Sequence, residues 1–584
     1  MNTLVIVLIA AVVLVCAYAG YGRWLAKTWG VDPNAKTPAV RLEDGKDYVP
    51  TKGWTVFAHQ FSSIAGAGPV TGAIQAAAFG WLPVLLWVLI GGVFFGAVTD
   101  FGALYASVKN DGKSMGLLIE KYIGKTGRKL FLLFCWLFCC IVIAAFADMV
   151  AGTFNAFDAD GAQVEAAFTN GAAGMVSIMF MVFAVVFGFI QKKFNFSGWR
   201  EAVIGIIFIV LSFAIGMNCP LVFGKTAWSY ITFVYIFFAA VLPMWMLKQP
   251  RDYMTTFMFG AMIAGAVIGL LVAHPTMNLP VFTGFSNAKL GTMFPILFVT
   301  VACGAVSGFH SLVSSGTSSK TVENEKDMLK VGYGAMVLES LLAVLALCVA
   351  GAAAAADGTP ASGTPFQIFS RGVAGFFEMF GVPVSIATVF MTMCVSALAL
   401  TSLDAVARIG RMSFQELFSV DDMEHAEGWR KLCCNVYFST FITLVFGFIL
   451  TQIGYANIWP LFGSANQLLS ALVLATLCVF LKVTGRNNKM LFPPLVIMLC
   501  VTFTALVQRL IAMVKAISAA ASTAIPAGET TWGAVFIANG LQLILAVLLI
   551  VLGLNIVFHS VKSYTTCDAP EAKDNAKATA KANA

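Results

Sequence analysis

The chain has 584 residues, of which 59% are hydrophobic and only 11% are charged, and its formal net charge is +7. Soluble domains are closer to a quarter charged, so this composition excludes a water-soluble globular enzyme and indicates a protein dissolved in the bilayer. The positive charge is concentrated in particular loops, which is typical of membrane topology and does not indicate nucleic-acid binding.

About fifteen apolar stretches are long enough to cross roughly 30 Å of hydrocarbon. Each is predicted to be a helix, because lipid offers no partner to an unpaired backbone group. The first stretch has no charged n-region and a basic loop follows it, so it is predicted to be a retained span. In chain order the stretches lie near 3–20, 54–79, 81–106, 129–152, 172–191, 201–217, 229–247, 255–273, 292–316, 331–356, 383–407, 431–452, 458–482, 489–515 and 531–559.

The loops between these stretches alternate in charge. Every loop that follows an odd-numbered stretch contains lysine or arginine, whereas the loop at 153–171 holds three acidic residues and no basic one. By the positive-inside rule this alternation predicts an outside N-terminus and a cytoplasmic C-terminus in a bacterial inner membrane. The tail at 563–584, rich in alanine and lysine, is expected to be disordered.

The stretch at 54–79 is predicted to be a broken helix. Glycines, a proline and several hydroxyls coincide at mid-depth, and unwound backbone is tolerated there only where it lines a cavity or is buried in protein. In transporters such breaks bind substrate; the alternative is a small-residue packing face. The residues expected to bind substrate here are Ser62, Ser63, Gly66, Gly68, Pro69, Thr71 and Gly72.

Two further stretches carry similar signals. The stretch at 229–247 contains Tyr235, which we add to the substrate-binding residues, and Pro243, which either breaks or merely kinks the helix. The stretch at 292–316 is unusually rich in hydroxyls, whose oxygens either bind a small cation or form interhelical hydrogen bonds. The predicted sodium-like site consists of Ala65, Ser311, Ser314 and Ser315.

Ionisable groups inside spans are costly and usually functional. Four of them are candidates for proton coupling, and the two histidines among them are expected to face each other. The alternative is that they only hold helices in place by hydrogen bonds. The candidates are His59, His310, Asp100 and Glu339.

Other charged residues have simpler interpretations. Asp404 and Arg408 are four residues apart on one helix, which predicts an ion pair. No arginine or lysine is predicted at mid-depth of the core. A carboxylate would therefore be bound by helix ends and hydroxyls, which favours a small mono-anion or a zwitterion.

Several motifs together resemble the carbon starvation protein A family, and the likeness extends over most of the chain. They are Asp47–Thr51, His59–Pro69, Leu242–Pro243, Gln249–Tyr253 and Ser307–His310. The resemblance implies uptake of small nutrients, with pyruvate and short peptides as the associated substrates. It also implies the amino acid–polyamine–organocation superfamily, whose leucine-transporter-like core is a five-plus-five inverted repeat.

The resemblance predicts how the chain is divided. If 54–79 is the first core helix, then 229–247 is the sixth and 292–316 is the eighth. The expected parts are a first helix and basic loop at 1–53, the core at 54–410, peripheral helices at 411–562 and the tail at 563–584.

We therefore predict an all-α polytopic membrane protein that acts as a proton symporter for a small organic nutrient such as pyruvate. The alternatives are a peptide permease of the same fold or, from a different class, a channel. An enzyme is not expected, since no HExxH motif or dense His/Asp/Glu cluster occurs. The predicted partners are the substrate, a proton and the bilayer. We expect no cofactor, no metal other than the possible sodium-like site, and no nucleic acid.

Overall fold

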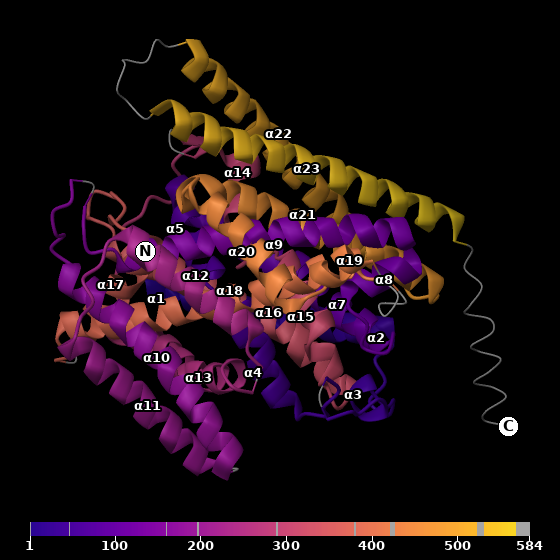
Figure 1. Ribbon diagram of the computed structural model, residues 1–584, viewed down its shortest axis with the longest axis horizontal. Coiled ribbons are helices and arrows are strands. Elements are labelled where there is room, and N and C mark those ends of the chain that lie inside the picture. The colour runs from indigo at the N-terminus through magenta and orange to yellow at the C-terminus, as the bar shows by residue number, and fades with distance from the viewer. Residues whose placement is uncertain are drawn as a thin grey trace.

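The computed structural model describes residues 2–45, 47–158, 160–194, 198–243, 245–287, 290–378, 381–420, 427–522 and 531–567. These residues form a bundle of helices (Figure 1), with one two-stranded ribbon of β1 (Ser286–Asn287) and β2 (Gly291–Thr292). Within them, eleven helical segments are long and apolar enough to span a membrane. The predicted all-α polytopic fold is therefore confirmed.

The longer helices follow one another in the order expected from the apolar stretches. Their bounds are α1 Thr3–Ala17, α2 Arg23–Trp29, α4 Gly53–Ile64, α5 Gly68–Ala76, α6 Trp81–Gly91, α7 Ala97–Val108, α9 Lys125–Phe154, α10 Ala167–Phe194, α11 Trp199–Asn218, α12 Lys225–Val241, α13 Lys248–Ala273, α14 Met293–Thr300, α15 Gly308–Gly316, α16 Ala335–Ala353, α18 Val384–Phe418, α20 Val436–Thr451, α21 Tyr455–Val483, α22 Phe492–Ser522 and α23 Thr531–Thr566.

Short elements connect these helices. They are α3 Pro38–Arg41, α8 Met115–Tyr122, α17 Pro365–Glu378, α19 Gly428–Cys433 and the tighter or wider turns η1 Tyr18–Gly22, η2 Ala77–Phe79, η3 Gly92–Gly96, η4 Ser318–Lys320, η5 Glu325–Asp327, η6 Leu329–Gly334 and η7 Lys489–Leu491. Each predicted stretch coincides with one or two helices. However, α12 and α20 are only 17 and 16 residues long, so the number fifteen stays a prediction.

The break in the second stretch is confirmed. Helix α4 ends at Ile64, because Ala65 takes non-helical dihedral angles (φ −72°, ψ 62°). Helix α5 then begins at Gly68 with Pro69 in its first turn, where the missing N–H of proline has no cost. Residues 65–67 between them are buried in protein, which is the environment that unwound backbone requires at this depth.

A second break lies between α14 and α15, in the stretch at 292–316. Helix α14 ends at Thr300, and α15 begins at Gly308 after the extended residue Ser307 (φ −133°, ψ 124°). The third predicted break is wrong. Helix α12 is continuous from Lys225 to Val241 and ends before Pro243. The proline thus terminates a helix instead of interrupting one.

The two broken helices begin similar series of elements. After α4 and α5 come a span that contains a π-helical segment (α6, η3, α7), a short helix (α8) and a long buried helix (α9). After α14 and α15 come η6 and α16, then the short helix α17 and the long helix α18. Helices α9 and α18 pack along each other, and α12 and α20 pack on both. A similar order of elements thus follows each of the two broken helices.

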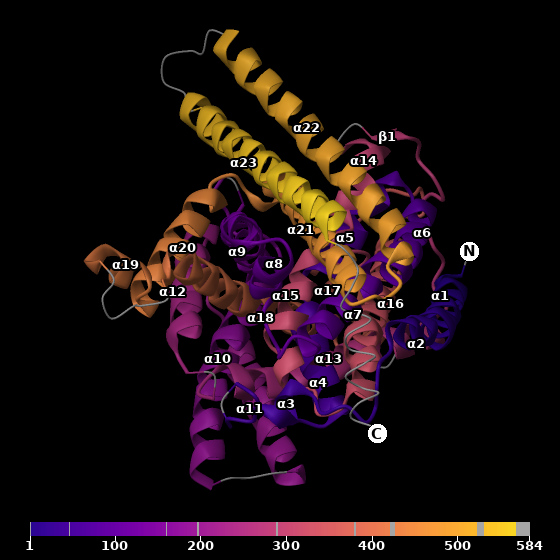
Figure 2. The same cartoon turned by 90° about the vertical axis from the view of Figure 1, so that its right-hand side faces the viewer.

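The remaining helices lie outside this packing. Helices α22 and α23 form a pair at one end of the molecule, and α10 and α11 form another at the opposite end (Figures 1 and 2). Both pairs have many exposed apolar side chains, as expected of helices in contact with lipid. By contrast, α21 is buried along its length and contacts α9, α15 and α22. The site described below lies in this inner packing.

Candidate functional site

The two breaks meet at a cavity in the centre of the packed helices. Its wall is formed by α4, the two breaks, and α9, α15, α18 and α21. The lining residues are Ile64, Gly66, Gly68, Phe138, Val142, Phe146, Cys303, Phe309, Ser402, Val406, Phe462 and Asn466. Of the predicted substrate-binding residues, the structure therefore places Gly66 and Gly68 directly in the cavity wall.

Glycine is required where the backbone of the broken helices approaches other groups. A Cβ on Gly66 would lie 2.1 Å from Oγ of Ser402, and one on Gly72 would lie 2.6 Å from the carbonyl oxygen of Thr300. The first contact shows that α18 packs closely against the break after α4. The second shows that α5 packs closely against the end of α14. Because the atom opposite Gly72 belongs to the backbone, it cannot move away at low cost.

Two polar side chains of the cavity wall were not predicted as binding residues. Oγ of Ser402 is buried and has no hydrogen-bond partner, which makes it available to a ligand. Oδ1 of Asn466 accepts from the backbone N–H of Phe309 at 3.1 Å, and its Nδ2 donates to Oγ of Ser307 at 3.0 Å. Asn466 of α21 thus caps the N-terminus of α15 from a neighbouring helix.

The other predicted substrate-binding residues around the first break are buried nearby. Ser62 and Ser63 lie in the last turn of α4, and Oγ of Ser62 donates to the carbonyl of His59 at 3.1 Å. Pro69 is in the first turn of α5, and Oγ1 of Thr71 donates to Sδ of Met149 at 3.4 Å. None of these four lines the cavity.

Three of the four predicted proton-coupling residues form one buried cluster, which we call the His310 triad. Nδ1 of His310 lies 3.0 Å from Oδ2 of Asp100, and its Nε2 lies 3.3 Å from Oε2 of Glu339. All three side chains have an exposed fraction of 0%. The triad joins α7, α15 and α16 through the two nitrogens of one imidazole ring.

The fourth residue, His59, lies elsewhere. It is partly exposed on α4, and the charged groups near it are Lys248 and Asp252 of α13. The predicted meeting of His59 and His310 is therefore wrong. Nδ1 of His310 is hydrogen-bonded to Asp100 of α7, and Glu339 of α16 lies beside Nε2.

The residues of the predicted sodium-like site lie on the first break and on α15, where two of the serines have hydrogen-bond partners of their own. Ala65 belongs to the first break, whereas Ser314 accepts a hydrogen bond from Gln60, and Oγ of Ser315 donates to the carbonyl of Ser311. Oγ of Ser311 is buried without a partner. Over the residues that the structure describes, no group of three or more His, Cys, Asp or Glu side chains is arranged to hold a metal ion.

Tyr235 belongs to a second buried charge cluster. This cluster lies on the face of α18 that is opposite to the central cavity. Its hydroxyl accepts from Nη1 of Arg251 at 2.6 Å, and Arg251 is paired with Asp252 at 2.9 Å and with Asp404 at 3.1 Å. Nε of Arg408 completes the cluster by donating to Asp404 at 3.1 Å, which confirms the predicted pair. We call these five residues the Arg251 cluster.

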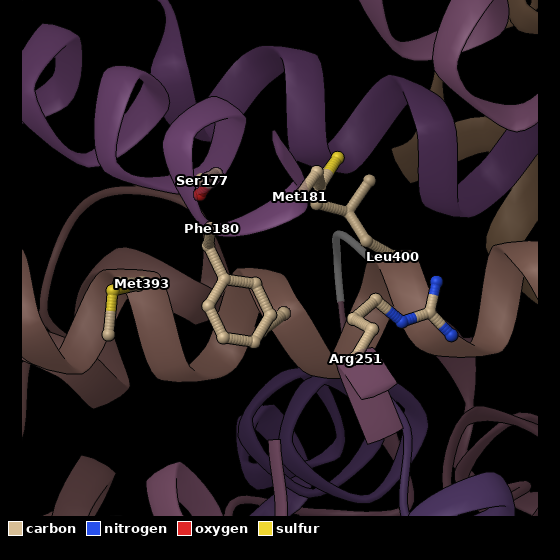
Figure 3. A pocket seen from close by; sticks show the side chains of 7 residues that line it. Ser177, Phe180, Met181, Arg251, Met393 and Leu400 are labelled. Carbon is tan, nitrogen blue, oxygen red and sulfur yellow. The ribbon is translucent and has the colours of Figure 1, made fainter. Parts of the chain in front are cut away.

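The Arg251 cluster places a basic side chain in the interior of the protein. The sequence predicts a cytoplasmic loop at residue 251, but Arg251 lies in the first turn of α13, and its side chain is only 2% exposed. It lines a small cavity with Ser177, Phe180, Met181, Met393, Ala397 and Leu400 (Figure 3). The wall of this cavity is almost entirely apolar apart from the guanidinium, which two aspartates already neutralise.

Known proteins show a clear relationship to this chain. The model of the family described as carbon starvation protein CstA matches residues 2–359 and 352–505. The chain belongs to this family. A curated relative from Escherichia coli, named peptide transporter CstA, is 32% identical over 582 residues, which cover 86% of this chain and 80% of that protein. Membership of this transporter family makes the chain a multi-pass bacterial membrane transporter and not an enzyme.

A second E. coli relative of this CstA family chain carries a different name. The pyruvate/proton symporter BtsT is 36% identical over 364 residues, which cover 60% of this chain and 49% of BtsT. Among solved structures, the Eremococcus coleocola manganese transporter covers 89% of this chain and 99% of its own at a TM-score of 0.48 and 10% identity. That likeness is too distant to carry an assignment.

Sequence reasoning overlooked Ser402, Asn466 and Arg251. In the sequence, Asn466 and Gln467 fit a simple helix-packing role, and no proline or glycine lies between Pro383, at the start of the stretch at 383–407, and Ser402. A signal for Ser402 was available in the run Thr401-Ser402-Leu403-Asp404, where three polar residues enter a long apolar helix. The signal for Arg251 was its position directly after Pro250, because proline is tolerated in the first turn of a helix.

Proposed function

We propose that this protein is a secondary active transporter that imports a small organic nutrient, such as pyruvate, together with a proton across the bacterial inner membrane. The single observation that carries the proposal is the His310 triad. It gathers three fully buried ionisable side chains around His310, and His310 belongs to the half-helix that also lines the central cavity.

The triad is suited to binding and releasing a proton. A protonated imidazole between two ionised carboxylates leaves one positive charge against two negative ones, so one further proton neutralises the group. Buried net charge is costly. The number of protons bound to the triad therefore affects how readily the triad stays buried, and its burial in turn affects how many protons it binds. Since the imidazole has one nitrogen on each carboxylate, it can accept a proton on one side and donate one on the other.

Coupling requires that proton and substrate act on the same element. Helix α15 meets this requirement, because His310 reaches the triad while the preceding residue, Phe309, lines the central cavity. A change in triad charge therefore acts directly on the cavity wall. We propose that substrate and proton bind to different sides of this half-helix.

For the substrate, the cavity wall favours a small mono-anion or a zwitterion. None of its lining residues is a lysine or an arginine. A carboxylate would be bound by the N–H groups at the start of α5, near Gly68, and by the free hydroxyl of Ser402. Asn466 would orient a polar group beside it, and the phenylalanines would exclude water. Ser62, Ser63, Pro69, Thr71 and Gly72 would support this wall from behind.

The repeated order of elements suggests a different division of the chain from the one predicted. We propose that the core extends from α4 through α21, with α10 and α11 inserted between its third and fourth helices. Under this division the peripheral part begins at α22 and not at residue 411. The predicted outside N-terminus and cytoplasmic C-terminus are retained. Residues 568–584 of the tail lie outside the described residues.

A peptide permease is the second candidate. It is favoured by the name of the E. coli CstA relative, which covers more of the chain than BtsT does. A competition experiment distinguishes the two candidates. Unlabelled dipeptides would inhibit uptake of labelled pyruvate only if both substrates enter the same cavity.

The test uses proteoliposomes loaded at pH 7.5 and diluted into pH 6.0 or pH 7.5 buffer, with labelled pyruvate or labelled dialanine outside. We expect accumulation of one of them only when the inward proton gradient is imposed. The variants Asp100→Asn, His310→Gln and Glu339→Gln should each lose this accumulation. Equal uptake with and without the gradient, for both substrates, would refute proton symport.

A further inference from the structure

Gln60 of α4 forms a buried connection between the two broken helices. Its Nε2 donates to Oγ of Ser314 at 2.8 Å, and its Oε1 accepts from Oγ of Ser318 at 2.6 Å. Gln60, Ser314 and Ser318 are all completely buried. One side-chain amide thus joins α4 to α15 and to the η4 turn that follows it.

The two ends of this connection lie one helical turn from functional groups. Ser314 follows His310 by four residues on α15, so both side chains project from the same side of this nine-residue helix. Gln60 precedes Ile64 by four residues on α4, and Ile64 lines the central cavity at the end of that helix. Gln60 therefore connects α15, on the side that carries His310, to the part of the cavity wall that α4 forms.

Backbone contacts connect the same two segments at their far ends. The N–H of Thr51 donates to the carbonyl of Thr321 at 3.0 Å, and the N–H of Val49 donates to that of Lys320 at 3.3 Å. Gln60 differs from these contacts because it lies between the cavity and the triad, where it can transmit a change in either one.

We propose that Gln60 is a positioning residue that couples proton binding at the His310 triad to the shape of the substrate cavity. The inference rests on the proposed symport. The groups that face His310 are Asp100 from α7 and Glu339 from α16, and a change in their shared charge moves α15. Gln60 transfers this movement to α4, and the cavity opens or closes with the state of the triad. Gln60 contacts neither the proton nor the substrate.

The experiment replaces Gln60 by methionine, which keeps most of the side-chain length and removes both hydrogen bonds. Two quantities are measured in proteoliposomes with the labelled substrate that the wild type transports. The first is accumulation driven by the pH gradient, and the second is gradient-free exchange of external for internal substrate. We expect accumulation to fall about tenfold or more while exchange stays within about twofold of wild type. The dependence of uptake on external pH should become flat.

Two further variants separate coupling from folding. Gln542→Met removes another buried glutamine, one that bonds Arg509 on the peripheral α22–α23 pair, and should change neither quantity. The triple variant Gln60→Met with Ser314→Ala and Ser318→Ala leaves no polar group unpaired at this position. If the triple variant regains accumulation, then Gln60 only satisfies buried hydroxyls and the inference is wrong.

The other possible results separate the coupling inference from the symport proposal. Full gradient-driven accumulation in Gln60→Met, alongside an active wild type, overturns the inference and leaves the symport proposal intact. Absence of gradient-driven accumulation in the wild type itself overturns the symport proposal and this inference with it. If Gln60→Met fails to fold, the triple variant takes its place, and lost accumulation with retained exchange supports coupling.

Discussion

The Arg251 cluster makes a quantitative prediction about buried charge. The prediction concerns a double-mutant cycle, in which Asp404→Asn and Arg251→Met are measured singly and together. Asp404 is 0% exposed and lies within 3.1 Å of both Arg251 and Arg408. Its neutralisation therefore removes the charge that these two guanidinium groups share.

The magnitude follows from the partners that remain. Removing one member of a buried ion pair costs about 3–5 kcal/mol. After Asp404→Asn, Arg251 still has Asp252 at 2.9 Å, and Arg408 still donates to the carbonyl of Leu242 at 3.0 Å. We therefore expect each single substitution to reduce the free energy of unfolding by about 3 kcal/mol, the lower end of that range. The double variant should lose less than the sum by about 1–3 kcal/mol.

The assay is reversible unfolding by sodium dodecyl sulfate in mixed micelles, followed by intrinsic fluorescence. The control is the same cycle at Arg41 and Asp111, which also form an ion pair but are 50% and 51% exposed. Its changes should each cost less than about 1 kcal/mol, because solvent screens an exposed pair. Additive losses at Arg251 and Asp404, or equal losses in both cycles, would refute the reasoning.

Three further changes test other parts of the site. Gly72→Ala should reduce the unfolding free energy by about 1–3 kcal/mol and slow uptake, because its Cβ would meet the backbone at the end of α14; unfolding in mixed micelles measures the first effect, and unchanged stability would contradict it. Ser402→Ala should raise KM more than it lowers kcat if its free hydroxyl binds substrate, as initial uptake rates at several concentrations would show. His59→Gln should alter the pH dependence of uptake less than His310→Gln does, and the reverse order in a pH profile would restore the predicted role of His59.

Much of the architecture was predictable because each signal was local. Apolar length indicated the spans, and the proline and glycines at 66–69 indicated the break after α4. The same reasoning failed for Pro243, since a proline that ends a helix and one that interrupts it look alike until the next helix is located. In the structure the next helix begins at Lys248, so the chain turns where the sequence suggested a broken span.

The functional residues were predictable only in part. His310, Asp100 and Glu339 were identifiable singly, since ionisable side chains are rare in apolar helices. Their assembly was not, because Asp100 lies 210 residues before His310 and because it depends on which face each of the three helices presents. The incorrect pairing of His59 with His310 came from comparing only the depth of the two residues in the membrane. The direction in which each side chain projects around its helix axis was not considered.

The contacts between the N-terminal loop and the segment after α15 affect how the protein is made. Oε2 of Glu325 accepts from the backbone N–H of Asp32, 293 residues earlier in the chain, and the same carboxylate pairs with Lys109 at 2.7 Å. During synthesis the loop therefore lacks this partner until Glu325, which follows α15, has left the ribosome. Contacts of such long sequence separation form slowly. Truncated chains that stop before residue 325 should consequently expose this loop to proteases, whereas the full-length protein should protect it.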